Sequence, residues 1–173
     1  MPFAKLNPCV RQLQPLEEHR VETLEEMIVK HPFLKGLNPD YFHLLQECAR
    51  SERFEAGQLV FQEGQEADHF YLIQTGQVRL GAFVPGRGTI TVQTVSAGAA
   101  LGWSWLFPPY QWHFSAHSNE ITELMAFDAQ FLRDTSEANH DFGYELIKRV
   151  SSVLLQRLQE TRLLLVDFYG LPN

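Results

Sequence analysis

Glycines divide the middle of the chain into short apolar runs, and this spacing restricts the fold more than any other feature of the sequence. The runs lie at residues 59–61, 70–73, 78–84 and 89–95. Short β-rich runs that recur about every ten residues, with turn residues between them, are typical of antiparallel barrels and sandwiches. The stretch VPGRGT at 84–89 predicts the tip of a hairpin, and the sheet pattern resumes at 112–117 and 121–127. We therefore predict a mainly β domain.

Helical periodicity replaces the sheet pattern on both sides of this region. We predict one helix from Leu16 to Lys30 and a second that begins at the N-cap Asn38. A short helix is predicted over 129–134 and a long one from Asn139 onward. One stripe of the long helix consists of Ile147, Val150, Leu154, Leu158, Thr161 and Leu165. This spacing fits a helix that pairs with its copy in a homodimer, which we favour, or a helix packed back onto the barrel.

Composition narrows the functional classes. The chain has 173 residues, enough for one domain, and a formal net charge of −7. It has no run of Lys and Arg of the kind that binds a phosphate backbone, which predicts no nucleic-acid binding. No apolar run has the length of a signal peptide or a membrane span, so we expect a cytoplasmic protein without a membrane anchor. Cys9 and Cys48 form no CxxC pair, and we expect both to be reduced thiols.

The glycine spacing also resembles that of a known family. Gly57, Gly64 and Gly76 frame the segment AGQLVFQEGQEADHFYLIQTG. This segment is similar to the first half of the cyclic nucleotide-binding domain of the catabolite activator protein family, in which glycines turn the corners of a β-roll. The apolar residues at 70–73 fit the family pattern, whereas Phe61 stands where a small β-branched residue is expected.

The resemblance implies an antiparallel, jelly-roll-like β-roll with N-terminal helices and a long C-terminal dimer helix. It divides the chain into an N-terminal lead-in and helix at 1–30, a cyclic nucleotide-binding-like domain at 31–138 and a dimerisation helix at 139–173. The family often joins this domain to a helix-turn-helix DNA reader, for which the chain leaves no room. We therefore expect a stand-alone regulatory domain that forms a homodimer and signals through a separate protein partner.

The stretch LGWSWLFPPYQWHFSA at 101–116 occupies the place of the family's phosphate-binding cassette. In the family a Glu accepts from the ribose hydroxyl and an Arg neutralises the cyclic phosphate. Here Gly102 is retained, but Trp103 replaces the Glu, and Phe114 replaces the Arg if Ser115 is aligned with the usual Ser/Thr. No Lys or Arg lies between Gly88 and Arg133. A phosphate buried without a counter-charge costs several kcal/mol, so we predict no ordinary binding of cyclic AMP or cyclic GMP.

Three interpretations of the aromatic cassette remain open: an altered ligand pocket, a core filled by aromatic side chains, and an exposed docking surface. In the pocket interpretation, a flat neutral effector of unknown identity is enclosed by walls and oriented by a few polar groups. The predicted walls are Trp103, Trp105, Trp112 and Phe114. The predicted polar groups are Ser104, Ser115 and Thr161.

A minority alternative keeps the nucleotide. Thr161 matches the family's dimer-helix threonine that reaches the base, and Arg162 beside it could supply the missing cation. We expect no catalytic residues, since the sequence has no nucleophile elbow, P-loop or paired carboxylates. We also expect no required cofactor and no metal, because His113 and His117 on one strand would lie about 13 Å apart.

Overall fold

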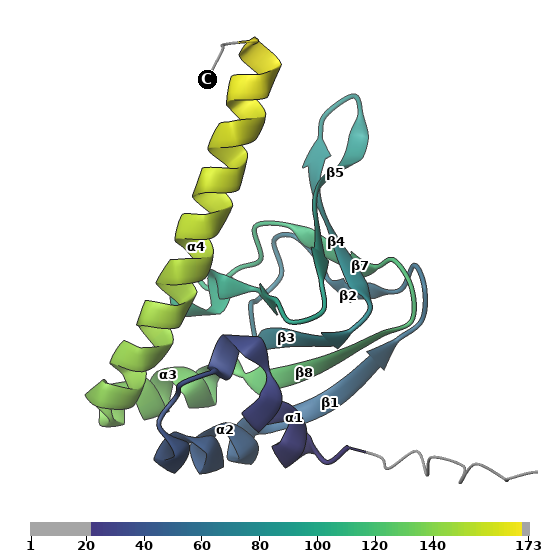
Figure 1. The fold of residues 1–173 in the computed structure, drawn as a ribbon. Coiled ribbons are helices and arrows are strands. Elements are labelled where there is room, and N and C mark those ends of the chain that lie inside the picture. Colours follow the sequence, from purple (N-terminus) through teal and green to yellow (C-terminus); the bar gives the residue numbers. More distant parts are fainter. Residues whose placement is uncertain (1–21, 171–173) are drawn as a thin grey trace, which may run out of the picture.

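The computed structural model describes residues 22–170 and consists of two four-stranded antiparallel sheets with helices at both chain ends (Figure 1). The first sheet has the order β1(Ala49–Phe54), β8(Thr122–Asp128), β3(His69–Thr75) and β6(Ala100–Leu101). The second has the order β2(Leu59–Phe61), β7(Ser115–Ser118), β4(Gln77–Val84) and β5(Gly88–Ser96). The predicted mainly β fold with flanking helices is thereby confirmed.

The centre of the first sheet is buried on both faces. Four consecutive residues of β3, Phe70 to Ile73, are buried, as are Leu124 to Phe127 of β8. Consecutive strand residues point to opposite faces, so both faces must be covered. The helices α2(Phe42–Cys48) and α3(Ala129–Ala138) contact this sheet, and the interior of the roll covers its other face. These near-continuous apolar runs are the ones that the sequence displays between its glycines.

The corner after β3 shows why glycine is needed there. Gly76 has a φ of +83°, and a Cβ at this position would lie 2.5 Å from Thr122 Oγ1 and 2.6 Å from the carbonyl oxygen of Ile121. Both the left-handed backbone and the close approach of the β7–β8 turn exclude a side chain. Gly76 therefore lets the chain pass from the first sheet into the second.

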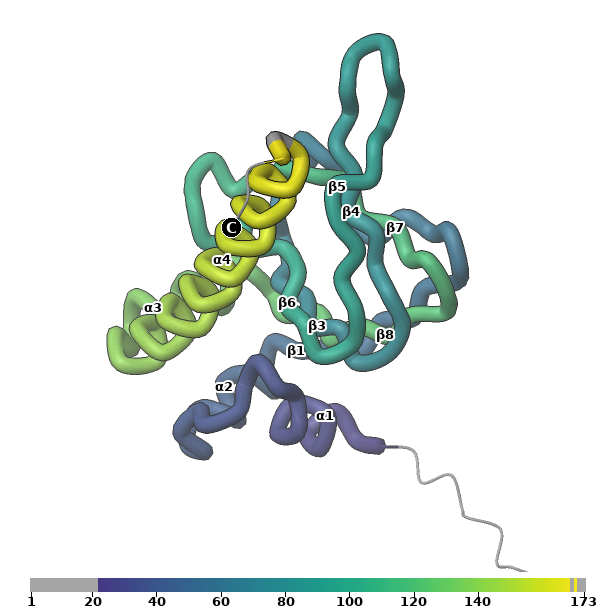
Figure 2. Tube along the Cα trace, turned by 45° about the horizontal axis from the view of Figure 1, so that its top comes forward, coloured from purple at the N-terminus to yellow at the C-terminus, as the bar shows by residue number. Residues whose placement is uncertain are grey.

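The β4–β5 hairpin projects beyond the rest of the roll (Figures 1 and 2). Its strands pair from Gln77↔Ser96 to Val84↔Gly88, which places Pro85 to Arg87 at the tip as predicted. Most of β5 is exposed, including the apolar side chains of Ile90 and Val92.

Strand β1 was not expected from the sequence. Its residues ARSERF are mostly polar, and only Phe54 is buried. The strand is at the edge of its sheet and pairs with β8 alone, from Ala49↔Phe127 to Phe54↔Thr122. An edge strand with solvent on one face needs few apolar residues, which explains its weak signal.

The N-terminal helices are α1(Leu24–Lys30), the single 3-10 turns η1(Pro32–Leu34) and η2(Pro39–Tyr41), and α2. The prediction of one continuous helix from Leu16 to Lys30 is wrong, because the helix begins at Leu24 with Thr23 as its N-cap, whose side chain accepts from the N–H of Glu26. The expected start at Leu16 lies outside the described residues. Asn38 is the N-cap, as predicted, and accepts from the backbone N–H of Asp40 at 3.1 Å. It caps the turn η2, after which α2 begins at Phe42.

The long helix α4(His140–Tyr169) runs along one side of the roll, and its C-terminal part extends past it (Figure 1). Its N-cap is the predicted Asn139, whose side chain accepts from the N–H of Phe142. The stripe predicted for this helix divides between two environments. Val150 is buried against the body, whereas Leu158 and Leu165 are more than half exposed. No helix in the part of the chain from 22 to 170 combines the length and apolar character needed to cross a membrane.

Candidate functional site

The cassette begins where β6 ends. Gly102 adopts a left-handed conformation with a φ of +82° and turns the chain into the short 3-10 helix η3(Trp103–Leu106). The ring of Trp112 lies directly against this glycine, because a Cβ on Gly102 would be 2.6 Å from Cζ3 and 2.8 Å from Cη2 of that ring. Gly102 is therefore required both for its backbone conformation and for the close approach of Trp112.

Trp112 is part of an aromatic stack inside the roll. Its ring centroid lies 4.0 Å from that of Phe61 at an interplanar angle of 15°, and 6.3 Å from that of Tyr71. Trp112 is 4% exposed and Phe61 is 7% exposed. The residue that departs from the family pattern in β2 is thus the stacking partner of a tryptophan in the cassette. Two aromatic side chains that are distant in sequence thus pack together inside the roll.

The space left beside the cassette is a cavity of about 20 Å³. A cavity of this size holds roughly one water molecule. Five residues predicted from the sequence line it, namely Gly102, Trp103, Ser104, Trp112 and Phe114. The other lining residues are Phe61, Leu80 and His113, so no Lys or Arg side chain faces the cavity.

The predicted polar groups are engaged within the protein. Ser104 is buried, and its Oγ lies 2.9 Å from Nδ1 of His113 in a hydrogen bond. Ser115 does not line the cavity, and its Oγ accepts from the N–H of Glu63 at 3.0 Å. The Ser104 hydroxyl therefore links two parts of the cassette, and the Ser115 hydroxyl links the cassette to the turn after β2.

Trp105 is a core residue. It is fully buried, with its ring centroid 5.7 Å from that of Phe70, and it does not line the cavity. Its indole N–H has no hydrogen-bond partner among the described residues. An unpaired buried donor costs about 1–3 kcal/mol, which the burial of so large an apolar ring offsets.

Arg133 of α3 connects the helix to the cassette, a role that the sequence did not reveal. Its Nη1 donates to the carbonyl oxygen of Trp105 at 2.8 Å, and its Nη2 donates to Gln130 at 2.7 Å. The guanidinium carbon also lies 4.5 Å from the ring centroid of Tyr110. Arg133 thus connects α3 to two positions of the cassette, Trp105 and Tyr110, and its charge faces a carbonyl and an aromatic ring.

Trp103 lies between the cassette and α4. It lines the cavity beside Gly102 and also a second void of about 10 Å³, which is bounded by Val150 and Val153 of α4. Trp103 is half-buried, less than the other two tryptophans. The residue that replaces the family's Glu therefore lines a void together with residues of the long helix.

Thr161 and Arg162 lie apart from the cassette in this chain. Both are exposed on α4, and neither lines the cavity. The Thr161 hydroxyl donates to the carbonyl oxygen of Arg157 within the same helix at 2.9 Å.

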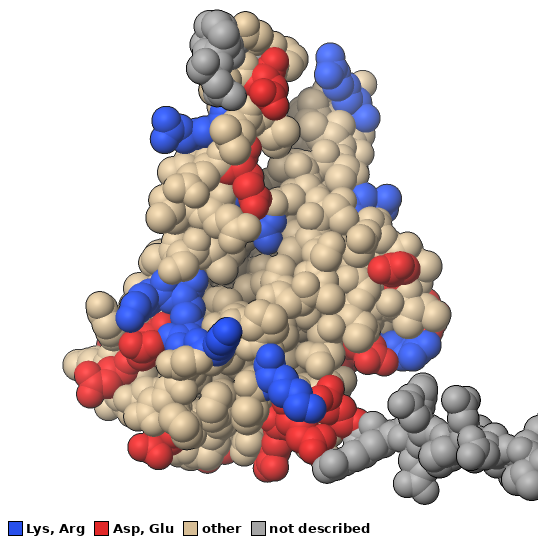
Figure 3. Space-filling model, viewed as in Figure 1, with Lys and Arg blue, Asp and Glu red and all other residues tan. Residues whose placement is uncertain are grey.

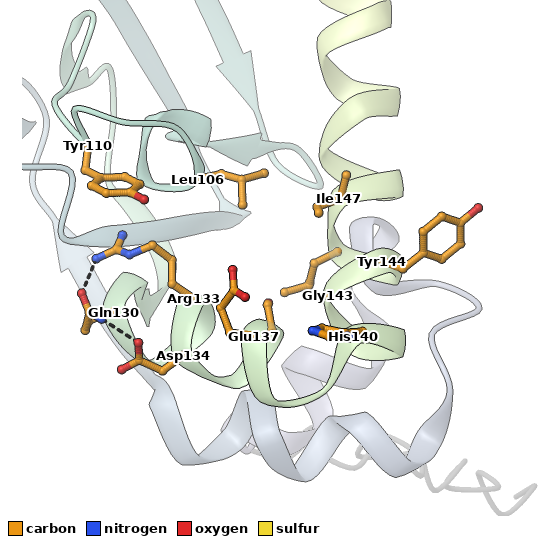
Figure 4. Close-up of a pocket in the computed structure, with 12 residues that line it drawn as sticks. Leu106, Tyr110, Gln130, Arg133, Asp134, Glu137, His140, Gly143, Tyr144 and Ile147 are labelled. Carbon is orange, nitrogen blue, oxygen red and sulfur yellow. Dashed lines mark hydrogen bonds between the residues drawn. The ribbon is translucent and has the colours of Figure 1, made fainter.

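A larger groove runs along the outside of the cassette loop (Figure 4). Its volume is about 580 Å³, and it is bounded by the loop, α3 and the start of α4. Leu106 and Ile147 provide apolar surface, and the Glu137 carboxylate points into the opening between α3 and α4 (Figure 4). The one arginine that lines it, Arg133, already donates to Trp105 and Gln130.

The described residues offer little for catalysis or metal binding. From residue 22 to residue 170, no group of three or more His, Cys, Asp and Glu side chains is arranged to hold a metal ion. Burial raises the pKa of the Cys48 thiol to about 12, so this thiol stays protonated near neutral pH.

Comparisons with known proteins agree with this architecture. A curated relative, the CRP-like cAMP-activated global transcriptional regulator of Mycobacterium tuberculosis, is 23% identical over 144 residues. The match covers 83% of this chain and 62% of that protein, so the chain spans less than two thirds of its relative's length.

Solved structures show the same fold. A candidate cyclic nucleotide-binding protein from Geobacter metallireducens GS-15 superposes with a TM-score of 0.70 at 27% identity, over 79% of this chain and 99% of that one. The sensor domain of the transcriptional regulator DNR from Pseudomonas aeruginosa superposes with a TM-score of 0.63 at 18% identity, over 79% and 91% of the two chains.

The family model for the cyclic nucleotide-binding domain matches residues 51–139, which is just over half of the chain's 173 residues. The matched segment begins in β1, contains the whole roll with the aromatic cassette, and ends at the N-cap of α4. The chain therefore belongs to the cyclic nucleotide-binding domain family.

Proposed function

We propose that this protein is a regulatory module whose cassette is held in one arrangement by its own aromatic side chains and needs no nucleotide. The packing of Trp112 against Gly102 and Phe61 carries this proposal, because it leaves only about 20 Å³ beside the cassette. Ligand pockets for small molecules usually measure about 300–1,000 Å³. Of the three interpretations of the cassette, the filled core is the one that this geometry supports best.

The electrostatics of the cassette support the same conclusion. A cyclic phosphate needs a cation or several free N–H donors. The residues that line the cavity include no Lys or Arg, and the guanidinium of Arg133 is directed at the Trp105 carbonyl. A phosphate placed here would lose its hydration without an opposite charge, at a cost of several kcal/mol.

The output surface of this module is the exposed face of α4, which we assign to pairing with a second copy. The apolar side chains of Leu155, Leu158 and Leu165 are each at least half exposed and lie within about 80° of one another around the helix. A row of large apolar side chains on a helix that extends past its own domain is typical of a helix that pairs with another. A separate protein partner would then read the arrangement of the paired helices.

Amide hydrogen exchange of the cassette tests the proposal. We expect the N–H groups of residues 102–106 to be protected in the free protein and unchanged by cyclic AMP or cyclic GMP. The variant Trp112→Ala should raise exchange there strongly. The control Phe107→Ala, which removes an aromatic ring that is 47% exposed, should have little effect on it. Fast cassette exchange in the free protein that slows on nucleotide addition would contradict the proposal.

One observation favours a second function, the altered pocket for a flat neutral ligand. Trp103 is half-buried and separates the two small voids, so rotation of its side chain would join them and open a path along α4. In that case the variant Trp103→Ala should gain binding of neutral aromatic compounds such as indole, measured by ligand-detected NMR. The filled core predicts weak binding of indole to the unaltered protein.

A further inference from the structure

A second groove lies between α4 and the body of the protein, away from the cassette cavity. Its volume is about 470 Å³. It is bounded by the turn η1, the β5–β6 turn and the middle of α4, and it shares no lining residue with the cassette cavity. On the face shown in Figure 3, charged side chains are sparse over the middle of α4 and the adjoining roll.

The groove is lined by apolar side chains, one polar side chain, Gln156, and one charged side chain. Phe33, Ala99, Ala100 and Val153 supply apolar surface, and Arg157 of α4 supplies the charge. The backbone N–H groups of the β5–β6 turn are not free to bind a ligand. Those of residues 97, 98 and 99 already donate to the carbonyl oxygens of residues 76, 73 and 96.

The guanidinium of Arg157 has no hydrogen-bond acceptor among the described residues. The nearest acidic side chain on α4, Glu160, is already engaged. Its Oε2 accepts from Gln93 at 3.2 Å and its Oε1 accepts from Gln156 at 2.9 Å. Partial burial lowers the pKa of Arg157, and the charge of Glu160 opposes this only in part. The side chain is therefore partly desolvated while its donors remain unused.

A guanidinium offers five N–H donors in a planar fork that matches a carboxylate. The guanidinium nitrogens of Arg157 are not fully buried, so a carboxylate would replace water around them with charge-assisted hydrogen bonds. The remaining lining would contact an apolar body, since Phe33 and Val153 present only hydrocarbon. We propose that this groove binds a small amphipathic carboxylate, whose head group pairs with Arg157 and whose apolar body lies along Phe33 and Val153.

Such a ligand would contact α4 and the body at once. Arg157 and Val153 belong to α4, whereas Phe33 and Ala99 belong to η1 and the β5–β6 turn. Binding would tie the position of α4 to the presence of the ligand, because the groove exists only when these elements lie together. This inference does not require a ligand in the cassette, because the groove shares no lining residue with the cassette cavity. Trp103 of the cassette borders a small void that Phe33, Ala100 and Val153 of the groove also line.

Octanoate is a suitable probe, with octanamide as its uncharged match and inorganic phosphate as the head-group control. We expect saturable binding of octanoate in a calorimetric titration, and at least tenfold weaker binding of octanamide and of phosphate. Arg157→Gln should weaken octanoate binding at least tenfold, in line with the loss of charge-assisted hydrogen bonds. Arg157→Lys keeps the charge but not the fork, and should weaken it less.

Arg162→Gln is the matched control, because Arg162 is exposed on the same helix and does not line the groove. It should leave octanoate binding unchanged. Circular dichroism and the melting temperature of each variant show whether it is folded. The proposal would be overturned if octanoate did not bind, if Arg157→Gln bound it as the unaltered protein does, or if phosphate bound equally well.

Discussion

Replacing Gly102 by Ala tests whether the Trp112 ring fills the cassette. At a φ of +82° an Ala costs about 1–2 kcal/mol because its Cβ crowds the backbone. The same Cβ would lie 2.6 Å from Trp112 Cζ3, and forced overpacking of a core costs typically 1–3 kcal/mol more. We therefore expect Gly102→Ala to lower the free energy of unfolding by about 2–5 kcal/mol.

Gly57→Ala provides the matched control. Gly57 has a φ of +81°, but no heavy atom lies within 4 Å of the position of its Cβ. This variant should show only the conformational cost of about 1–2 kcal/mol. Urea unfolding followed by tryptophan fluorescence measures both values, and their difference of about 1–3 kcal/mol isolates the contact with Trp112.

The double variant Gly102→Ala, Trp112→Leu completes the test. If the Trp112 ring causes the additional cost, its removal should make the Ala at position 102 no more destabilising than the Ala at position 57. Equal costs for Gly102→Ala and Gly57→Ala in the unaltered background would show that the ring does not occupy the cassette. The argument for a filled pocket would then fail.

Three further predictions concern other parts of the fold. Arg133→Ala should lower the unfolding free energy by about 1–3 kcal/mol, since Arg133 donates to the Trp105 carbonyl and lies over the Tyr110 ring. The control Arg79→Ala, at an exposed site of β4, should change the unfolding free energy little. Equal effects of the two variants would rule out the connection between α3 and the cassette. His31 is buried as the neutral tautomer that accepts from Phe33 N–H at Nδ1 and donates from Nε2 to the Ile73 carbonyl, and burial lowers its pKa from 6.5. As the pH falls, the unfolded chain takes up a proton at His31 before the folded chain does, so the stability present above pH 6.5 should be lost as the pH falls below it. The unfolding free energies of the protein and of His31→Gln, measured in urea, should therefore change differently between about pH 7.5 and about pH 5.5. Parallel pH dependence of the two proteins would refute this. Leu158→Glu should convert a dimer into a monomer in size-exclusion chromatography with light scattering, whereas Gln159→Glu on the same helix should not. If the unaltered protein were already a monomer, pairing through α4 would be excluded.

Much of the fold could be predicted because its signals are local. The apolar runs at 59–61, 70–73, 78–84 and 89–95 correspond to β2, β3, β4 and β5. Burial explains the run in β3, whereas β5 is mostly exposed and is marked by its β-branched residues and the flanking glycines. Strand β1 is the exception, because an edge strand with one exposed face tolerates the polar sequence ARSERF.

The cassette was harder to predict, because its contacts join residues that are distant in sequence. Phe61 departs from the family pattern and Trp112 is a predicted pocket wall, but only the structure shows that their rings stack 4.0 Å apart. Likewise, the absence of cations between Gly88 and Arg133 was evident, whereas the reach of Arg133 to the Trp105 carbonyl was not.

The sequence does not show how α4 is rotated about its axis, and this limits the prediction of which of its arginines faces the body. The sequence singles out Arg162 because it follows Thr161, whereas in the structure Arg157 lines the groove between α4 and the body. Positions 157 and 162 differ by about 140° around a helix, so one faces the roll when the other faces solvent. The packing of Leu146 and Val150 determines which side of α4 faces the body. Because α4 also has apolar residues on its other sides, the sequence does not show which side is buried.

A calorimetric titration with cyclic AMP tests the central claim most directly. The account predicts no saturable heat up to about 1 mM nucleotide, since the aromatic side chains occupy the cassette and no cation faces it. Cyclic GMP should behave in the same way. Saturable binding of one cyclic nucleotide per chain in the micromolar range would contradict the account.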